Sequence, residues 1–271
     1  MYIGNKKHFR ILTVAIISIL ICSAVFYSVK TKNLPFSSCR KKVEVCEFHF
    51  PYVGQGDAIL IRSPDGDVLV DSGPNSSEDL IVGYLEDVGV EELFLTFITH
   101  PDEDHIGGAD RVISSFRSPR VYLPDPDSRD SDCRALRAAA SSLGIRLQKA
   151  SGGDVFTVGK LKLTVISPRE PLFGDPNDDS LVIVAEYGSV RVMLTGDMSV
   201  KTEKRLLSEY PESVPRCDIL KAGHHGSSTS SSEEWIKAVS PTRTTRLPTH
   251  CLPLRNLRRV CSTCGASCQN S

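Results

Sequence analysis

The strongest signal in the chain is the stretch Thr99-His100-Pro101-Asp102-Glu103-Asp104-His105-Ile106-Gly107-Gly108, which follows the apolar run Leu93 to Ile98. That run predicts a strand buried on both faces, so two imidazoles and several carboxylates emerge together at its carboxyl end. Carboxylates held this close repel one another, and a divalent cation is the natural counter-charge. A merely solvated acidic loop would need neither the histidines nor the double glycine. The stretch therefore predicts a metal site.

A second histidine cluster, Lys221 to Ser228, also follows a predicted strand. Its adjacent His224 and His225 would point to opposite sides of an extended chain, so we expect at most one of them to bind metal. The other is then placed to contact substrate or a neighbouring carboxylate. The glycines on both sides of the pair would let the backbone approach an anionic group closely.

Two aspartates occupy equivalent places in the two halves of the chain, each at the end of an apolar strand and beside a glycine. They are Asp71, in Val68 to Gly73, and Asp197, in Val192 to Asp197. A buried strand end does not normally hold an unpaired carboxylate. We interpret Asp197 as a bridging metal ligand. For Asp71 two roles remain open, orientation of neighbouring side chains and capping of a turn.

Apolar periodicity elsewhere predicts strands in two groups, each with helices to cover it. The predicted strands are 43–50, 58–61, 68–70, 93–98, 121–123, 161–166, 181–187, 190–194 and 218–221. The predicted helices start near Ser76 and after Gly108, and cover 133–143, 200–207 and 233–239. Two packed sheets with helices outside make an α/β layered sandwich.

Six ordered segments resemble the metallo-β-lactamase superfamily, and more closely the extracytoplasmic hydrolase domain of the ComEC family of DNA-internalisation competence proteins. They are Val53-Gly54-Gln55-Gly56-Asp57-Ala58, Val70-Asp71-Ser72-Gly73-Pro74, His100 to Gly108, Asn177-Asp178-Asp179-Ser180-Leu181, Leu194-Thr195-Gly196-Asp197 and Gly223-His224-His225-Gly226-Ser227. The resemblance covers about 43–241. It implies a four-layered αββα sandwich with metal ions in the groove between the sheets.

The resemblance also assigns site residues by position. His100 and Asp102 would serve one metal ion, and Asp104 and His105 the other, with Asp197 bridging them. His224 is a further candidate ligand. The candidate catalytic residues are Asp104, His224, His225 and Lys221, of which the last three would bind phosphate or assist the leaving group.

The implied cofactors are two divalent ions, Mn²⁺ or Zn²⁺. Asn177 to Asp179 stands where the superfamily has a further histidine, and Asp102 stands where it has its second histidine. The site is therefore richer in oxygen than a typical zinc site. Oxygen ligands favour Mn²⁺ or Mg²⁺, which makes manganese a serious candidate.

The N-terminal part predicts a membrane anchor. No charged residue occurs from Ile11 to Val29, a length that can cross a hydrocarbon core about 30 Å thick. We expect residues 1–30 to form a single-pass anchor in the cell membrane, residues 31–42 a polar linker, and the body to lie outside the cytoplasm. A cleaved signal peptide is the alternative interpretation.

The C-terminal part departs from the family. We assign 43–241 to the hydrolase domain and 242–271 to an atypical, Cys- and Arg-rich tail with no apolar run that would form a strand. The family continues here with a strand and a late histidine in Gly-His-Pro, and His250 lacks that setting. The tail is either solvated or the product of a shifted reading frame. Cys261-x-x-Cys264 alone is a weak zinc signal.

Composition limits the functions to consider. The 32 basic and 33 acidic residues give a net charge of −1, so no global basic field attracts nucleic acid. The motifs indicate metal-assisted hydrolysis, whereas DNA as substrate, with a separate uptake channel as partner, comes from the resemblance alone. The expected activity is that of a phosphodiesterase or nuclease related to DNA uptake. Alternatives are a thioester or lactone hydrolase, and an inactive, truncated membrane-tethered relative.

Overall fold

The computed structural model describes residues 43–245, which fold around two six-stranded sheets. The first sheet has its strands in chain order. Its strands are β1 (Glu47–His49), β2 (Ala58–Ser63), β3 (Gly66–Ser72), β4 (Leu93–Phe97), β5 (Val121–Leu123) and β6 (Leu147–Lys149). The pairs β1–β2 and β2–β3 are antiparallel, and the pairs from β3 to β6 are parallel.

The second sheet repeats this plan. Its strands are β7 (Val155–Val158), β8 (Leu161–Ser167), β9 (Val182–Tyr187), β10 (Val190–Leu194), β11 (Ile219–Lys221) and β12 (Arg243–Thr245), again in spatial order. Strands β7 to β10 pair antiparallel, and β10, β11 and β12 pair parallel. In each sheet, one strand has an antiparallel neighbour on one side and a parallel neighbour on the other. This strand is β3 in the first sheet and β10 in the second.

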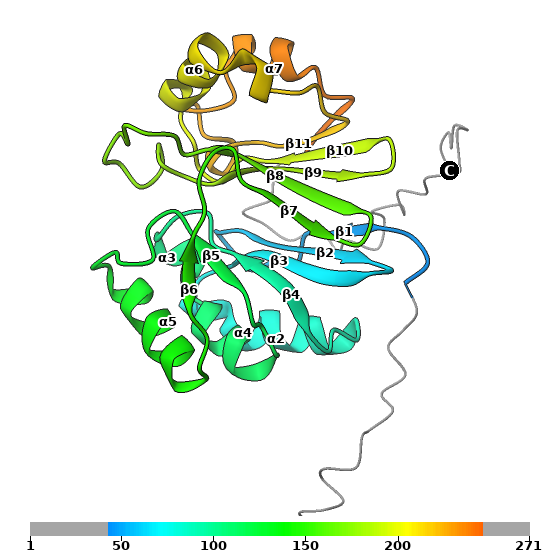
Figure 1. Cartoon of the computed structure of the whole chain (residues 1–271), viewed down its shortest axis with the longest axis vertical. Helices are drawn as coiled ribbons and strands as arrows, with labels where there is room; N and C mark the ends of the chain where they lie inside the picture. Colours follow the sequence, from blue (N-terminus) through cyan, green and yellow to red (C-terminus); the bar gives the residue numbers. More distant parts are fainter. Residues whose placement is uncertain (1–42, 246–271) are drawn as a thin grey trace, which may run out of the picture. The chain divides into compact units, whose positions relative to one another are not determined.

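Helices form the parallel crossovers and cover the outer faces. They are α2 (Glu78–Asp87), α3 (Glu103–Ile106), α4 (Ala109–Ser115) and α5 (Ser131–Ser142) in the first half, and α6 (Val200–Glu209) and α7 (Glu233–Val239) in the second. Figure 1 shows α2, α4 and α5 on one side, α6 and α7 on the other, and the two sheets between them. Within residues 43–245, the predicted αββα sandwich is confirmed.

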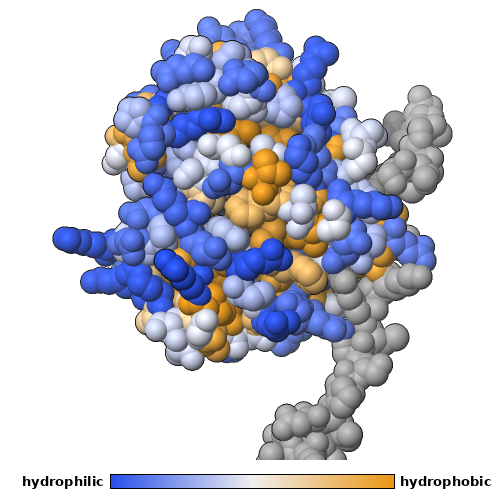
Figure 2. Space-filling view, viewed as in Figure 1, coloured by the Kyte–Doolittle hydropathy of each residue, from blue (hydrophilic) through white to orange (hydrophobic). Residues whose placement is uncertain are grey.

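The sequence patterns explain the layers. Inward-facing residues of both sheets, such as Ile59, Val70 and Leu163, form one buried cluster between them. The opposite faces pack against helices, through Leu85 on one side and Trp235 on the other. Figure 2 shows apolar surface gathered in the middle of one face, over the strand layers, whereas the outer helical layers are mainly hydrophilic.

The structure corrects the predicted elements in several places. Strand β12 follows Pro241 and pairs with β11, so the prediction that no strand follows Pro241 is wrong. The short elements β6, β7 and α3 were not predicted. Cys46 is a free, buried thiol in the core.

No helix within residues 43–245 is long and apolar enough to cross a membrane. The predicted anchor, linker and most of the predicted tail, including His250 and Cys261-x-x-Cys264, lie outside these described residues.

Candidate metal centre

His105, on the short helix α3, is held by a carboxylate behind its ring. Its Nδ1 lies 2.9 Å from Asp71 Oδ2, and Thr99 fixes that carboxylate by donating from its backbone N–H (2.7 Å) and from its hydroxyl (2.8 Å). Asp71 stands at the end of β3 in a left-handed conformation, φ 59°. Because Nδ1 is engaged, Nε2 points forward, to 3.3 Å from Asp197 Oδ1. Asp71 thus orients a neighbour, the first of its two predicted roles.

His225 has the same arrangement on the opposite side of the site. Its Nδ1 lies 3.2 Å from Asp57 Oδ1, and its Nε2 lies 3.2 Å from Asp104 Oδ2 and 3.2 Å from Asp197 Oδ2. The two forward-facing nitrogens, Nε2 of His105 and Nε2 of His225, are 3.3 Å apart. Two histidines from distant parts of the chain therefore converge on the carboxylate of Asp197, each supported from behind by another aspartate.

This convergence fits a bound cation. Four residues, Asp57, His105, Asp197 and His225, each offer a ligand atom within 4.8 Å of one another. Around a tetrahedral ion with bonds of about 2.1 Å, ligand atoms lie about 3.4 Å apart, close to the separations found here. Asp57 also faces the rear nitrogen of His225, the position of a supporting carboxylate rather than a direct ligand.

His100 and Asp102 lie beside this cluster. The His100 ring is fully buried, with its centroid 4.1 Å from that of His105 and its Nδ1 3.0 Å from Thr99 Oγ1. Its buried Nε2 has no hydrogen-bond partner among the described residues, and the nearest carboxylate oxygen, Asp102 Oδ2, is 3.7 Å away. A buried nitrogen normally has a hydrogen-bond partner, so the free Nε2 of His100 beside the Asp102 carboxylate fits a second cation position.

The pKa values of the histidines and of Asp197 show that the cluster stabilises positive charge on the histidines and negative charge on the carboxylate. Burial lowers the pKa of His105, but Asp71 and Asp197 oppose burial and raise it to about 10. The pKa of His225 rises to about 11 because hydrogen bonds to Asp104, Asp197 and Asp57 outweigh its burial. In the same way the histidines hold the pKa of Asp197 well below its usual range, against the effect of burial. The field that retains protons here equally favours a metal cation.

Lys221, at the end of β11, is fully buried and faces the carboxylates. Its Nζ donates to Gly196 O (2.8 Å) and lies 3.4 Å from Asp197 Oδ1, with a close ion pair to Asp57. Burial lowers the pKa of this ammonium, but Asp57 and Asp197 raise it above its usual value. We predicted contact with substrate phosphate from Lys221. The structure instead places it behind the site, where it neutralises buried carboxylates.

The prediction placed His224 and His225 on extended chain, but the structure does not. Both have left-handed backbones, φ 46° and 50°, in a tight turn after Gly223. Both rings consequently approach Asp197, with His224 Nε2 at 3.8 Å and His225 Nε2 at 3.2 Å from Oδ2. The His224 side chain is 38% exposed and that of His225 only 10% exposed. His225 therefore joins the inner cluster, and His224, the predicted ligand, lies at the rim.

Sequence reasoning missed Asp57. It was quoted only as part of Val53 to Ala58, although an acid before the buried strand β2 was a usable signal. Asp57 is held close to α3 because its backbone N–H donates to the carbonyl oxygen of Asp104 (3.1 Å). The preceding Gly56 allows this approach, since a Cβ there would lie 2.2 Å from the same oxygen. Asp178, in the segment that replaces the usual histidine, accepts from the hydroxyls of Ser199 and Thr202 instead of entering the cluster.

Comparison with known proteins places this site in a family. The chain is 31% identical over 208 residues to ComE operon protein 3 of Bacillus subtilis (strain 168), covering 70% of the chain and 26% of that protein. It is 30% identical over 196 residues to Recombination protein 2 of Haemophilus influenzae, covering 70% and 22%. Competence protein ComA of Neisseria gonorrhoeae is 27% identical over 189 residues, covering 69% and 25%. The chain thus spans about a quarter of the length of these relatives.

Two solved structures match the chain at low sequence identity. A metallo-beta-lactamase HARLDQ motif mutant from Cronobacter sakazakii matches with a TM-score of 0.46 and 16% identity, covering 68% of this chain and 80% of that one. The metallo-beta-lactamase fold protein YhfI from Bacillus subtilis matches with a TM-score of 0.45 and 16% identity, covering 75% and 83%. The family model of the metallo-beta-lactamase superfamily matches residues 51–250, which include every histidine and carboxylate of the metal centre. The chain belongs to the metallo-beta-lactamase superfamily.

Proposed function

We propose that this protein is a metal-dependent hydrolase that cleaves phosphodiester bonds in DNA. The observation on which the proposal depends is the meeting of His105 Nε2 and His225 Nε2, 3.3 Å apart, against the carboxylate of Asp197. Divalent ions bound there would lower the pKa of water and neutralise negative charge on a phosphate. The outer Asp102, with 47% of its side chain exposed, keeps this centre accessible to a substrate.

The surrounding residues have distinct tasks in this proposal. Asp71 and Asp57 hold the two rings with their Nε2 atoms forward, so little reorganisation is needed when a substrate arrives. Asp197, between the rings, would be shared by the two ion positions. His224 is exposed at the rim, where it would contact a substrate oxygen and supply a proton to the leaving group.

The donor set favours manganese over zinc. The two proposed ion positions together offer three carboxylates and three imidazoles. These are Asp102, Asp104 and Asp197, and His100, His105 and His225. Sites rich in oxygen donors suit Mn²⁺ and Mg²⁺ better than a site of nitrogen and sulfur does. We therefore propose two divalent ions, one held by Asp104, His105, Asp197 and His225, and one by His100, Asp102 and Asp197.

DNA as the substrate is supported by the relatives, two of which are named Recombination protein 2 and Competence protein ComA. In this proposal, residues 1–30 anchor the protein in the cell membrane, and the catalytic body lies outside the cytoplasm. The proposed partner is a separate channel that carries the DNA.

The test uses the purified full chain in detergent, freed of metal and reloaded with Mn²⁺ or Zn²⁺. Single-stranded DNA and a thioester are offered as substrates, with Asp197→Asn as the inactive control. We expect cleavage of DNA that requires Mn²⁺, stops with chelator and is absent from the variant. Hydrolysis of the thioester alone would identify an ester hydrolase, and a metal-loaded protein that hydrolyses neither would identify an inactive relative; either result overturns the proposal.

A further inference from the structure

Glu203, in the first half of α6, is a fully buried carboxylate that faces neither of the proposed ion positions. Its two oxygens accept hydrogen bonds from the backbone N–H groups of Ser231 and Ser232, the latter at 2.9 Å. Burying a carboxylate is costly unless it is well paired, so these two bonds specify where the segment around Ser231 lies relative to α6.

The segment around Ser231 is hydrogen-bonded to Gly223, the residue directly before His224 and His225. Gly223 N–H donates to Ser231 Oγ (3.0 Å), and Ser230 Oγ donates to Gly223 O (2.6 Å). Both backbone groups of Gly223 are therefore held by serines. Ser231 adopts a left-handed conformation, φ 56°, as do His224 and His225. Non-glycine residues stay in this region only where their surroundings hold them there.

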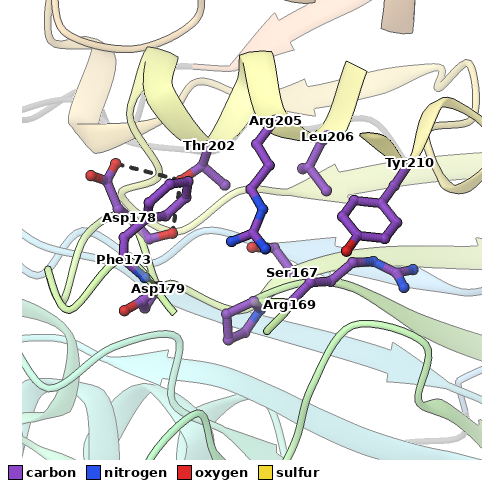
Figure 3. A pocket seen from close by; sticks show the side chains of 10 residues that line it. Ser167, Arg169, Phe173, Asp178, Asp179, Thr202, Arg205, Leu206 and Tyr210 are labelled. Atoms are coloured by element: carbon purple, nitrogen blue, oxygen red, sulfur yellow. Dashed lines mark hydrogen bonds between the residues drawn. The ribbon is translucent and has the colours of Figure 1, made fainter. Parts of the chain in front are cut away.

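The start of α6 is also bonded to this segment and to the loop between β8 and β9. Val200 N–H donates to Thr229 O (2.9 Å), within the same serine-rich segment. Asp178 lies beside a pocket between the β8–β9 loop and α6, where it accepts a hydrogen bond from the Thr202 hydroxyl (Figure 3). It also accepts one from the hydroxyl of Ser199. Helix α6 begins three residues after Asp197. One helix end thus lies three residues from Asp197 and is bonded to the segment that holds Gly223, which precedes His224 and His225.

We propose that Glu203 is a positioning residue for the metal centre, which acts through Ser231 and Gly223 to hold His225 Nε2 against Asp197. The inference rests on the proposed metal-dependent function, because it assigns Glu203 a part in building that same site. Without the carboxylate, the turn around His224 and His225 can relax, and the two Nε2 atoms of His105 and His225 no longer face one ion. Glu203 would then act on metal affinity while touching no metal.

Glu203→Gln tests this role. Glutamine has the same size as glutamate, but its amide NH₂ replaces one of the two oxygens that accept hydrogen bonds. One of the backbone N–H groups of Ser231 and Ser232 therefore loses its acceptor. We expect the full chain to bind Mn²⁺ in calorimetric titration roughly tenfold more weakly, at the lower end of the range for residues that support ligands. With Co²⁺ as the probe, its visible absorption spectrum should also change, because that spectrum reports the arrangement of ligands around the ion.

Ser231→Ala provides a second variant that leaves Glu203 in place and removes the acceptor of the Gly223 N–H. It should weaken Mn²⁺ binding in the same direction. Because both residues act through one path, the double variant should lose less affinity than the two single losses combined predict. If Glu203→Gln does not fold, Ser231→Ala still tests the path.

Asp67→Asn is the matched control. Asp67 is a buried carboxylate on β3 of the first sheet, paired with Arg62 at 3.5 Å, whereas the serine segment follows β11 of the second sheet. It should lower thermal stability without changing Mn²⁺ affinity or the Co²⁺ spectrum. If Glu203→Gln and Ser231→Ala behave like this control, Glu203 has a structural role only and the inference is wrong. If the unmodified chain binds no metal, the proposed function itself fails.

Discussion

At the scale of single residues, the metal centre combines negative charge with one permanent positive charge. Asp57 and Asp197 both face the ammonium of Lys221, and all three side chains are buried. Burial opposes ionisation of Asp57, yet Lys221 and His225 hold its pKa at about 2. The lysine thus keeps both carboxylates ionised before any metal arrives. Removing one partner of such a buried set leaves an uncompensated charge, which is more costly than losing a surface pair.

Lys221→Met should therefore destabilise the metal-free protein by about 3–5 kcal/mol, the usual cost of breaking a buried ion pair. Urea unfolding in the presence of chelator measures this change. The control is Lys162→Met, which removes an exposed pair with Glu186 and should cost about 0–1 kcal/mol. Equal losses for the two variants would contradict the role assigned to Lys221.

At the scale of elements, the loop before β2 must pass very close to α3. Gly56, at φ 133°, lies where a Cβ would approach the Asp104 carbonyl oxygen to 2.2 Å. Its neighbour Gly54, at φ 87°, has open space around the position of a Cβ. The two glycines therefore separate two physical effects, since Gly54 needs only a left-handed backbone, whereas Gly56 also needs the absence of a side chain.

Gly56→Ala should cost about 3 kcal/mol or more, because the loop must move away from α3 and take Asp57 with it. Gly54→Ala should cost only about 1–2 kcal/mol, the penalty for a left-handed residue. Thermal unfolding of both variants gives the comparison, and Mn²⁺ titration should show weaker binding for Gly56→Ala alone. If Gly54→Ala is the more damaging change, the close contact between loop and helix is not what selects glycine.

The elements also show what sequence reasoning can reach. Long apolar runs such as β4 and β10 were predicted because burial imposes a readable pattern. Strand β12, Arg-Thr-Thr, has no such pattern and forms because β11 offers it a parallel edge. Likewise Asp57 and Glu203 stand out only through partners at least 28 positions away in the chain. Local motifs thus singled out the histidines, Asp71 and Asp197, whereas the supporting roles of Asp57 and Glu203 became visible only in the fold.

At the scale of the whole molecule, the metal centre joins the two halves of the sandwich. His100, Asp104 and His105 follow β4 of the first sheet. Asp197 and His225 follow β10 and β11 of the second sheet. Parallel strands in both sheets end at the same side, so the halves meet through these loops as well as through the apolar core. A bound ion would therefore link the halves, and its binding energy would add to folding stability.

Mn²⁺ should consequently raise the thermal stability of the full chain. At a free concentration of about 100 times the dissociation constant, binding to the folded state contributes about 2.7 kcal/mol. For a domain of this size each kcal/mol shifts Tm by about 2–4 °C, so we expect a rise of roughly 5–10 °C that chelator reverses. Scanning calorimetry with and without Mn²⁺ measures it. Asp197→Asn, which removes the carboxylate facing both histidines, should abolish most of the rise, because the ion then loses the ligand shared by the two halves. A Tm unaffected by Mn²⁺ in the unmodified chain would contradict an ion that links the two halves.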